Sequence, residues 1–246
     1  MNRSITWIKH LVLTALGAIL ISASMIHLAG EFITLGEQLL LLSGCILLSS
    51  TIVLIPYAME DPTKLSHQLL LILCTGICTL LIIAWLTPLS LLSPILWRIT
   101  VGLCLLIVTL TAVAGLLTQL TDNHNSITLW ITLLLLITAG TPIWLGPAVE
   151  LFYLEQSTIN AIITTSPLSY LAALADWDYL RGEWFYRHTP FGGLRFDYPS
   201  ISITSLIYLT IGLACHYIRR IIATEKPVDN ICIKHQSLSI LGVMHK

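Results

Sequence analysis

Six stretches of this chain each run for about twenty residues with almost no charged side chain, and they limit the possible folds more than any other feature. A helix needs roughly 20 mainly apolar residues to cross a hydrocarbon core about 30 Å thick, because each residue adds about 1.5 Å. We therefore expect an all-α integral membrane protein with about six transmembrane helices, forming one domain over residues 1–246. The expected helices lie near Leu11–Leu28, Leu39–Tyr57, Gln68–Thr87, Ile99–Leu117, Ile127–Leu145 and Ile201–Ile221.

The composition indicates that the main partner of the chain is the lipid bilayer. Hydrophobic residues make up 56% of the chain and charged residues 10%, whereas a soluble domain carries roughly 25% charged residues. The net charge of -1 gives no sign of a nucleic-acid partner. The first apolar run is long enough to span, and the next follows closely, so we expect a retained first helix rather than a cleaved signal.

The lysine and arginine residues predict which side of the membrane each end of the chain faces. With a cytoplasmic N-terminus, eight basic residues fall on the inner side and four on the outer side. Cytoplasmic loops carry the excess of basic residues in most membrane proteins. We therefore expect both termini in the cytoplasm, with residues 222–246 as a cytoplasmic tail and a short polar inner loop around Glu60–His67.

The segment between the fifth and sixth expected helices differs in composition from the rest of the chain. We call residues 149–200 the cap. Its first part predicts two short helices, Ser157–Ile163 and Pro167–Ala175, that lie in the outer leaflet or dip into it. Pro167 suits the first turn of the second helix, with Ser166 as its N-cap. Its second part gathers tryptophan, tyrosine, arginine and acidic residues, a mixture typical of the lipid headgroup level.

Two interpretations of the cap stay open. The favoured one is a folded interfacial cap that packs against the helix bundle or a neighbouring protein, in which arginines pair with nearby acidic residues; the acidic candidates are Asp176, Asp178, Glu183 and Asp197. The other is an outer gate, or a site for a substrate or lipid headgroup. Its candidate residues are Trp177, Arg181, Trp184, Tyr186, Arg187 and Arg195. Arg98, at the outer edge of the fourth expected helix, is expected to extend toward the interface.

Sequence motifs for catalysis are absent. The chain has no G-x-x-x-x-G-K-[ST] loop, no G-x-S-x-G and no H-E-x-x-H, so we expect no catalytic residue, no metal site and no cofactor. One alternative uses histidine: His10 and His216 would lie at similar depth near the inner membrane edge, where two imidazoles can hold a haem. That alternative describes a haem-binding cytochrome subunit.

The order of features from the fifth expected helix onward resembles the membrane subunits of type-2 ABC exporters. The matching residues are Pro142 and Pro147, then Ser166-Pro167-Leu168, then Tyr179-Leu180-Arg181, and finally Arg219-Arg220. The resemblance covers about 80 C-terminal residues and the topology of the remainder. It implies six spans with both ends in the cytoplasm and short re-entrant helices between the last two spans.

The resemblance implies a permease subunit of an ATP-driven exporter, located in the bacterial inner membrane. Such a subunit pairs with a copy of itself or a second membrane subunit, and a separate soluble ATPase drives it. The inner loop falls where this family contacts its ATPase, so the expected coupling residues are Glu60, Asp61, Lys64 and His67. The competing function is a non-catalytic subunit of a larger membrane enzyme complex, which would use the cap as a docking surface.

Overall fold

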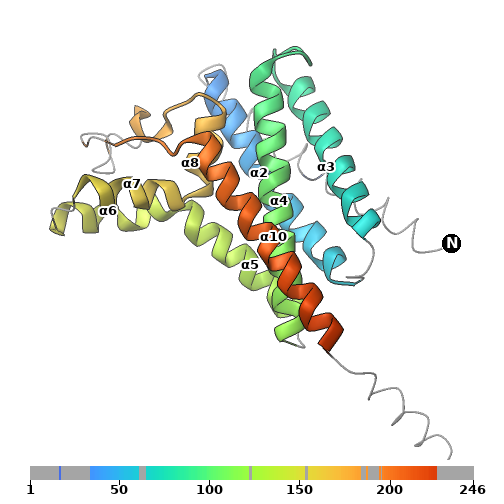
Figure 1. Ribbon diagram of the computed structural model, residues 1–246. Helices are drawn as coiled ribbons and strands as arrows, with labels where there is room; N and C mark the ends of the chain where they lie inside the picture. Colours follow the sequence, from blue (N-terminus) through green and yellow to red (C-terminus); the bar gives the residue numbers. More distant parts are fainter. Residues whose placement is uncertain are drawn as a thin grey trace, which may run out of the picture.

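The computed structural model of the protein describes residues 17, 34–60, 65–121, 124–152, 155–183, 187, 194 and 196–225. Within these ranges the regular elements are all helices (Figure 1). In chain order they are α2 (Leu35–Glu60), α3 (Leu65–Leu86), α4 (Pro94–Leu120), α5 (His124–Ala139), α6 (Thr141–Phe152), α7 (Gln156–Thr165), α8 (Pro167–Leu174), the 3-10 helix η2 (Tyr179–Arg181) and α10 (Ile201–Glu225).

Helix α2 begins four residues before the expected position because its first turn carries a capping box. Thr34 precedes the helix, and its backbone N–H donates to the Glu37 carboxylate over 2.7 Å. The Thr34 hydroxyl accepts in return from the backbone N–H of Glu37 over 3.4 Å. This reciprocal pairing satisfies N–H groups that a helix start otherwise leaves without partners.

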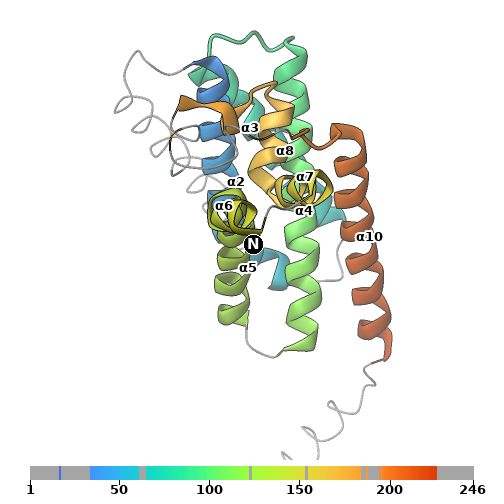
Figure 2. The ribbon, with the colours of Figure 1, turned by 90° about the vertical axis from the view of Figure 1, so that its left-hand side faces the viewer.

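Helix α4 is the central element of the bundle. It starts at Pro94, after Ser93 in an extended conformation, which suits proline because the first helical N–H needs no partner. Half of its length is buried, and it packs against α2, α3, α5, α8 and α10. Two views a quarter turn apart show α4 running between α5 and α10 (Figure 2).

Helix α10 lies at the edge of the bundle. Only 11% of its apolar stretch is buried, since α4 and the short helix α8 are its principal neighbours. Its contact with α4 is close: the Thr109 hydroxyl donates to the Tyr208 carbonyl over 2.9 Å, and Gly212 lies against Thr109. The remaining sides of α10 expose aliphatic residues, as expected of a helix that faces lipid or a membrane partner.

Three helices of the described residues are long and apolar enough to cross a membrane. They cover Leu35–Ile52, Pro94–Leu120 and Ile201–Ile222, and a bent pair formed by α5 and α6 raises the number to four. Helix α3 coincides with the third expected span. The first expected span, near Leu11–Leu28, lies outside the described residues except for Gly17. The fold is that of an all-helical, multi-pass membrane protein, and the count of six spans stays a prediction.

The expected fifth span is not one straight helix. The structure ends α5 at Ala139 and begins α6 at Thr141, with a bend of 46° between them. Helices α6 and α7 then project sideways from the bundle, and α8 returns into it (Figures 1 and 2). The prediction of two short helices in the cap is confirmed as α7 and α8, whose bounds lie within about two residues of those expected.

Candidate functional site

The break between α5 and α6 is caused by a proline, and hydroxyl groups satisfy the carbonyls that it leaves without donors. Pro142 has no N–H for the Thr138 carbonyl, which accepts instead from the Thr141 hydroxyl over 2.6 Å. The N–H of Ile143 bonds to Gly140, so the Ala139 carbonyl also loses its helical donor. The Ser166 hydroxyl donates to that carbonyl over 3.0 Å. The hydroxyl groups of Thr141 and Ser166 thus replace the backbone donors that the break removes.

Ser166 joins this break to the start of α8. Its backbone is extended, with φ -81° and ψ 121°, and Pro167 follows in the first helical turn, as predicted. Its hydroxyl does not cap α8, however, because it bonds to α5. The N-terminal end of α8 is thereby tied to the point at which the fifth span breaks.

Helix α8 is a short helix buried inside the bundle. Six of its eight residues are buried, and it contacts α2, α4, α5, α7 and α10. Gly102 of α4 makes room for it, because a Cβ there would lie 2.2 Å from the Leu174 side chain. The Tyr170 hydroxyl shares a 2.7 Å hydrogen bond with Ser205 of α10. This part of the cap is thus a core element, whereas the sequence left open whether it lies on the surface.

The C-terminal end of α8 has the hydrogen bonds of a Schellman motif. The N–H of Trp177 donates to the Ala172 carbonyl over 3.0 Å, and that of Asp176 to the Ala173 carbonyl over 3.3 Å. Asp176 has φ 52°, the left-handed conformation in which glycine is the usual residue. An aspartate costs about 1 kcal/mol more than glycine there, which calls for a compensating contact.

That contact is an ion pair with Arg98 of α4. The two guanidinium N–H groups face the two carboxylate oxygens, with Nη1 3.3 Å from Oδ1 and Nη2 bonded to Oδ2. Both side chains are partly exposed, at 37% for Arg98 and 58% for Asp176. Such paired geometry is stronger than a single contact. Arg98 was expected to extend toward the interface; it is partly exposed, and it also ties the start of α4 to the end of α8.

Trp177 adds a second tie beside this ion pair. A Cβ at Gly36, in the first turn of α2, would lie 2.5 Å from the Trp177 ring and 2.7 Å from its Cβ. The indole therefore packs directly on the α2 backbone. We call Gly36, Arg98, Asp176 and Trp177 the outer junction, since these residues bring together the starts of α2 and α4 and the end of α8.

The 3-10 helix η2 is held by Asp178 and Tyr198. Asp178 caps η2 by accepting from the backbone N–H of Arg181 over 3.2 Å, and it pairs with the Arg181 guanidinium at 3.4 Å. The Tyr198 hydroxyl donates to Asp178 over 2.8 Å and accepts from the N–H of Leu180 over 3.3 Å. Burial raises the pKa of Tyr198 far above its ordinary value, so this phenol stays protonated and remains a donor.

Further aromatic contacts make the described part of the cap compact. Tyr179 is buried and shares a 3.0 Å hydrogen bond with Ser169 of α8, and burial raises its pKa. The Arg181 guanidinium lies over the Phe196 ring at 5.3 Å from the ring centre, within the range of a cation–π contact. Asn160 of α7 accepts from the N–H of Asp197 over 3.1 Å. These bonds join α7, α8 and η2 to the segment that leads into α10.

The residues predicted for the cap are only partly described. Trp177 and Arg181 lie in the contacts above, and Arg187 pairs with Glu183 at the exposed surface. The predicted pairing of cap arginines with nearby acidic residues is thus confirmed for Arg181 and Arg187, while Asp176 pairs with Arg98 instead. Trp184, Tyr186 and Arg195 lie outside the described residues.

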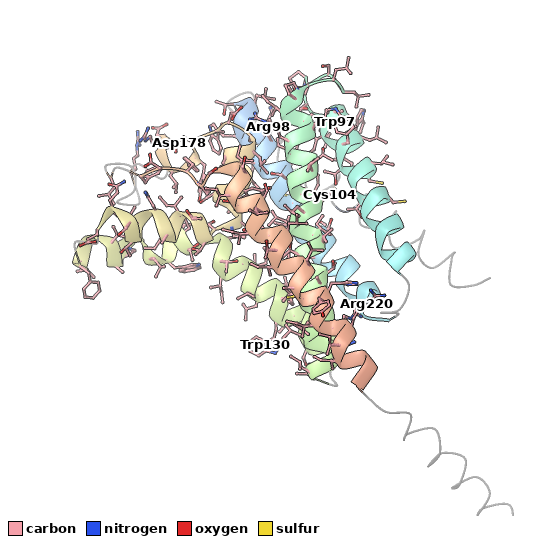
Figure 3. All side chains as sticks on the ribbon, in the orientation of Figure 1. Trp97, Arg98, Cys104, Trp130, Asp178 and Arg220 are labelled. Atoms are coloured by element: carbon pink, nitrogen blue, oxygen red, sulfur yellow. The ribbon has the colours of Figure 1, made fainter. Side chains whose placement is uncertain are left out.

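The two predicted coupling residues that the structure describes, Glu60 and His67, lie at the other end of the bundle. Glu60 is the last residue of α2 and His67 belongs to the first turn of α3, whereas Asp61 and Lys64 lie outside the described residues. The end of α2 and the start of α3 face the same end of the bundle as the last turns of α10 (Figure 1). Figure 3 places Trp97 and Arg98 toward the opposite end, away from Trp130 and Arg220.

The described part of the chain contains no group of three histidine, cysteine or acidic residues arranged to hold a metal ion. His216 is half-buried on α10, and its proposed haem partner, His10, lies outside the described residues.

No family model, curated protein or solved structure matches this chain. The resemblance to type-2 ABC exporter subunits therefore rests on the residue pattern alone.

The outer junction was not foreseen from the sequence. Arg98 and Asp176 are 78 positions apart, and neither the spacing of the two residues nor the local pattern links them. One signal was present: an Asp-Trp-Asp run directly after an apolar helix, where glycine or asparagine usually ends the helix. Chemically, the outer junction offers paired charges and packed rings rather than a reactive group.

Proposed function

We propose that the chain is the membrane-embedded permease subunit of an ATP-driven exporter, and that it works as a dimer with a separate ATPase in a bacterial inner membrane. The observation that carries this proposal is the interrupted span at Gly140, followed by the buried helix α8. Interrupted helices at membrane depth occur where they are enclosed by protein or line a pathway, and transporters build their substrate sites around them.

Two further observations agree with this proposal. The end of α2 and the start of α3 lie at the same end of the bundle as the basic end of α10, so an ATPase docked there would act on both (Figure 1). The low burial of α10 leaves an apolar surface for a second membrane subunit. ATPase closure against Glu60, Asp61, Lys64 and His67 would then drive α2 and α3, and the cap would control the outer exit.

The test is purification of the tagged full-length chain from its native membrane in mild detergent, with identification of its companions by mass spectrometry. A soluble ATPase in stoichiometric amount supports the exporter. Charge reversal at Glu60, Asp61 and Lys64 together is expected to lower its recovery at least about tenfold, since contacts between charged surfaces depend on complementarity. The matched control is Glu155→Lys, an exposed residue before α7. Undiminished recovery after charge reversal would contradict the coupling assignment.

The second candidate is a non-catalytic subunit of a larger membrane enzyme complex. The same low burial of α10 favours it, because a structural subunit also needs a long apolar surface for its neighbours. The purification separates the two candidates: redox or other membrane-enzyme subunits without an ATPase would replace the exporter by this function. A Soret band lost on His216→Ala would instead support the haem-binding subunit.

A further inference from the structure

Residues with non-helical backbone conformations lie on both sides of α8. Ser166 is extended before it, and Asp176 is left-handed after it. Between them, the eight residues of α8 form a rigid unit buried among five helices. Rotation about these two residues would move α8 as a unit and leave the neighbouring helices intact.

The fastening at the outer end of α8 is chemically different from the packing along its length. Along its length α8 is held by buried apolar packing and by hydrogen bonds such as Tyr170–Ser205, whereas the ion pair at its outer end, beside the packed Trp177, is partly exposed on both sides. Glycine would suit the backbone of Asp176 better, so the aspartate is explained by its carboxylate and by Arg98. A partly exposed ion pair is a weak and reversible fastening, which suits a contact that opens and closes.

We propose that Arg98 and Asp176 form an outer latch, which holds α8 inside the bundle when closed and releases it toward the outer face when open. The consequence for transport rests on the proposed function, since release of α8 would open the exit. The latch itself does not depend on that function, because it concerns the position of α8 in this chain.

The first experiment measures access to α8. Ala172, fully buried on α8, is changed to cysteine in a full-length chain whose six native cysteines are replaced, and the chain is placed in nanodiscs. A water-soluble maleimide then reports how often α8 is exposed. Asp176→Asn is expected to speed labelling about three- to tenfold, as loss of a paired charge contact implies. Glu183→Gln, the same change in the exposed pair with Arg187, is expected to change the rate less than twofold.

A double-mutant cycle shows whether the contact itself is responsible. Arg98→Gln alone should speed labelling as Asp176→Asn does, and the double variant should label no faster than either single variant. Rates that multiply in the double variant, or an Asp176→Asn rate equal to that of Glu183→Gln, would overturn the latch. Because the cycle uses two different single variants, loss of one through misfolding still leaves the other to compare with the control.

The second experiment separates a latch from a static tie. Arg98→Cys and Asp176→Cys are joined by a flexible thiol cross-linker that a reductant cleaves. The linked chain, with its ATPase, is expected to keep its thermal stability and lose transport at least about tenfold, and reductant should restore transport. Unchanged transport in the linked chain would reject the latch. If no ATPase or transport is found at all, the proposed function fails, and the labelling cycle still decides the latch.

Discussion

Gly36 and Trp177 form the closest side-chain-to-backbone contact of the outer junction. The ring and the Cβ of Trp177 both lie within 2.7 Å of the place where a Gly36 side chain would begin. The Cβ of Trp177 is bonded to its backbone, so it cannot move away from an added Gly36 side chain unless that backbone moves as well. At Gly44, eight residues later in the same helix, an added Cβ would lie 3.8 Å from its nearest neighbour, a methyl group of Leu168, which is an ordinary contact distance.

Gly36→Ala is therefore expected to destabilise the protein by about 1–3 kcal/mol, the usual cost of overpacking. Gly44→Ala, its matched control, should be neutral or stabilise by up to about 1 kcal/mol, because alanine favours a helix interior. Thermal unfolding in detergent measures both, at roughly 2–4 °C per kcal/mol for a chain of this size. Equal effects of the two changes would contradict the close packing of Trp177.

Tyr198 makes the cap sensitive to alkaline pH. Burial, reinforced by the Asp178 carboxylate, raises the pKa of its phenol in the folded chain above the ordinary value of about 10. The folded state thus holds this proton more tightly than the unfolded state does. Its contribution to stability is complete below about pH 10 and falls as the pH rises above that value.

Tyr198→Phe is expected to lower stability by about 1–2 kcal/mol at pH 8, because the Leu180 N–H and the Asp178 carboxylate each lose a partner. The variant should also lose less stability than the wild type between pH 8 and pH 10.5. Melting temperatures at the two pH values measure both effects. Tyr217→Phe, an exposed tyrosine of α10, serves as control, and a response equal to that control would exclude the proposed role of Tyr198.

At the scale of elements, the broken span depends on hydroxyl groups from two segments. Thr141 satisfies the Thr138 carbonyl from within the break, whereas Ser166 reaches the Ala139 carbonyl from 27 residues further along the chain. The bond from Ser166 links the start of α8 to the end of α5, although α6 and α7 separate these two helices in the sequence. The bend and the position of α8 therefore depend on each other.

Ser166→Ala is expected to cost about 1–3 kcal/mol, because it leaves the Ala139 carbonyl without a donor. Pro142→Ala supplies an N–H that lets the α5 ladder continue, so the cost of Ser166→Ala should shrink when both changes are combined. Thermal unfolding of the four variants measures the coupling. Thr165→Ala, whose hydroxyl bonds only to its own helix, is the control. Additive effects of Ser166→Ala and Pro142→Ala would show that the break and α8 are independent.

Features that depend on neighbouring residues were the ones the sequence predicted well. Apolar length located the three helices that are long enough to cross a membrane, and a Ser-Pro pair located the start of α8. The expectation that cap arginines pair with nearby acidic residues holds for Arg187 and Glu183, which are four positions apart. The break at Gly140 was missed, although Gly140-Thr141-Pro142 was a visible signal, because the apolar run continues through it without a change in hydropathy.

Features that depend on distant residues could not be read from one sequence. The partner of Arg98 is set by where α8 ends in space, and the hydroxyl of Ser166 bonds to α5 rather than to its own helix. Apolar periodicity also gave no reason to place α8 in the core, since its partly buried and fully buried positions carry similar side chains. Packing among five helices decides these contacts.

At the scale of the whole molecule, exposed tryptophans mark two ends of the bundle. Trp97 lies near the start of α4, and Trp130 lies in the part of α5 nearest the opposite end (Figure 3). Tryptophan concentrates at both membrane–water interfaces, so these two side chains indicate the direction across the bilayer. The start of α4 and the cap then share one face, and the end of α10 shares the other.

Reporter fusions test this orientation. The distribution of basic residues favours a cytoplasmic C-terminus and a cap on the outer side. A fluorescent protein fused after Lys246 is therefore expected to fluoresce, and alkaline phosphatase inserted after Gly193 is expected to be active. A tag at the N-terminus should be accessible from the cytoplasm as well. Opposite locations of the two termini would mean an odd number of spans and would contradict the expected six.

The burial of α8 also governs how the protein can be made. The helices of a membrane protein insert one after another and pack against each other afterwards. Helices α2, α4 and α5 leave the ribosome well before α8, yet α8 supplies contacts to all three. Until α8 has followed them, these helices lack the contacts that α8 supplies. Factors that shield Gly36 and Gly102 during that interval would recognise surfaces that Trp177 and Leu174 cover in the folded protein.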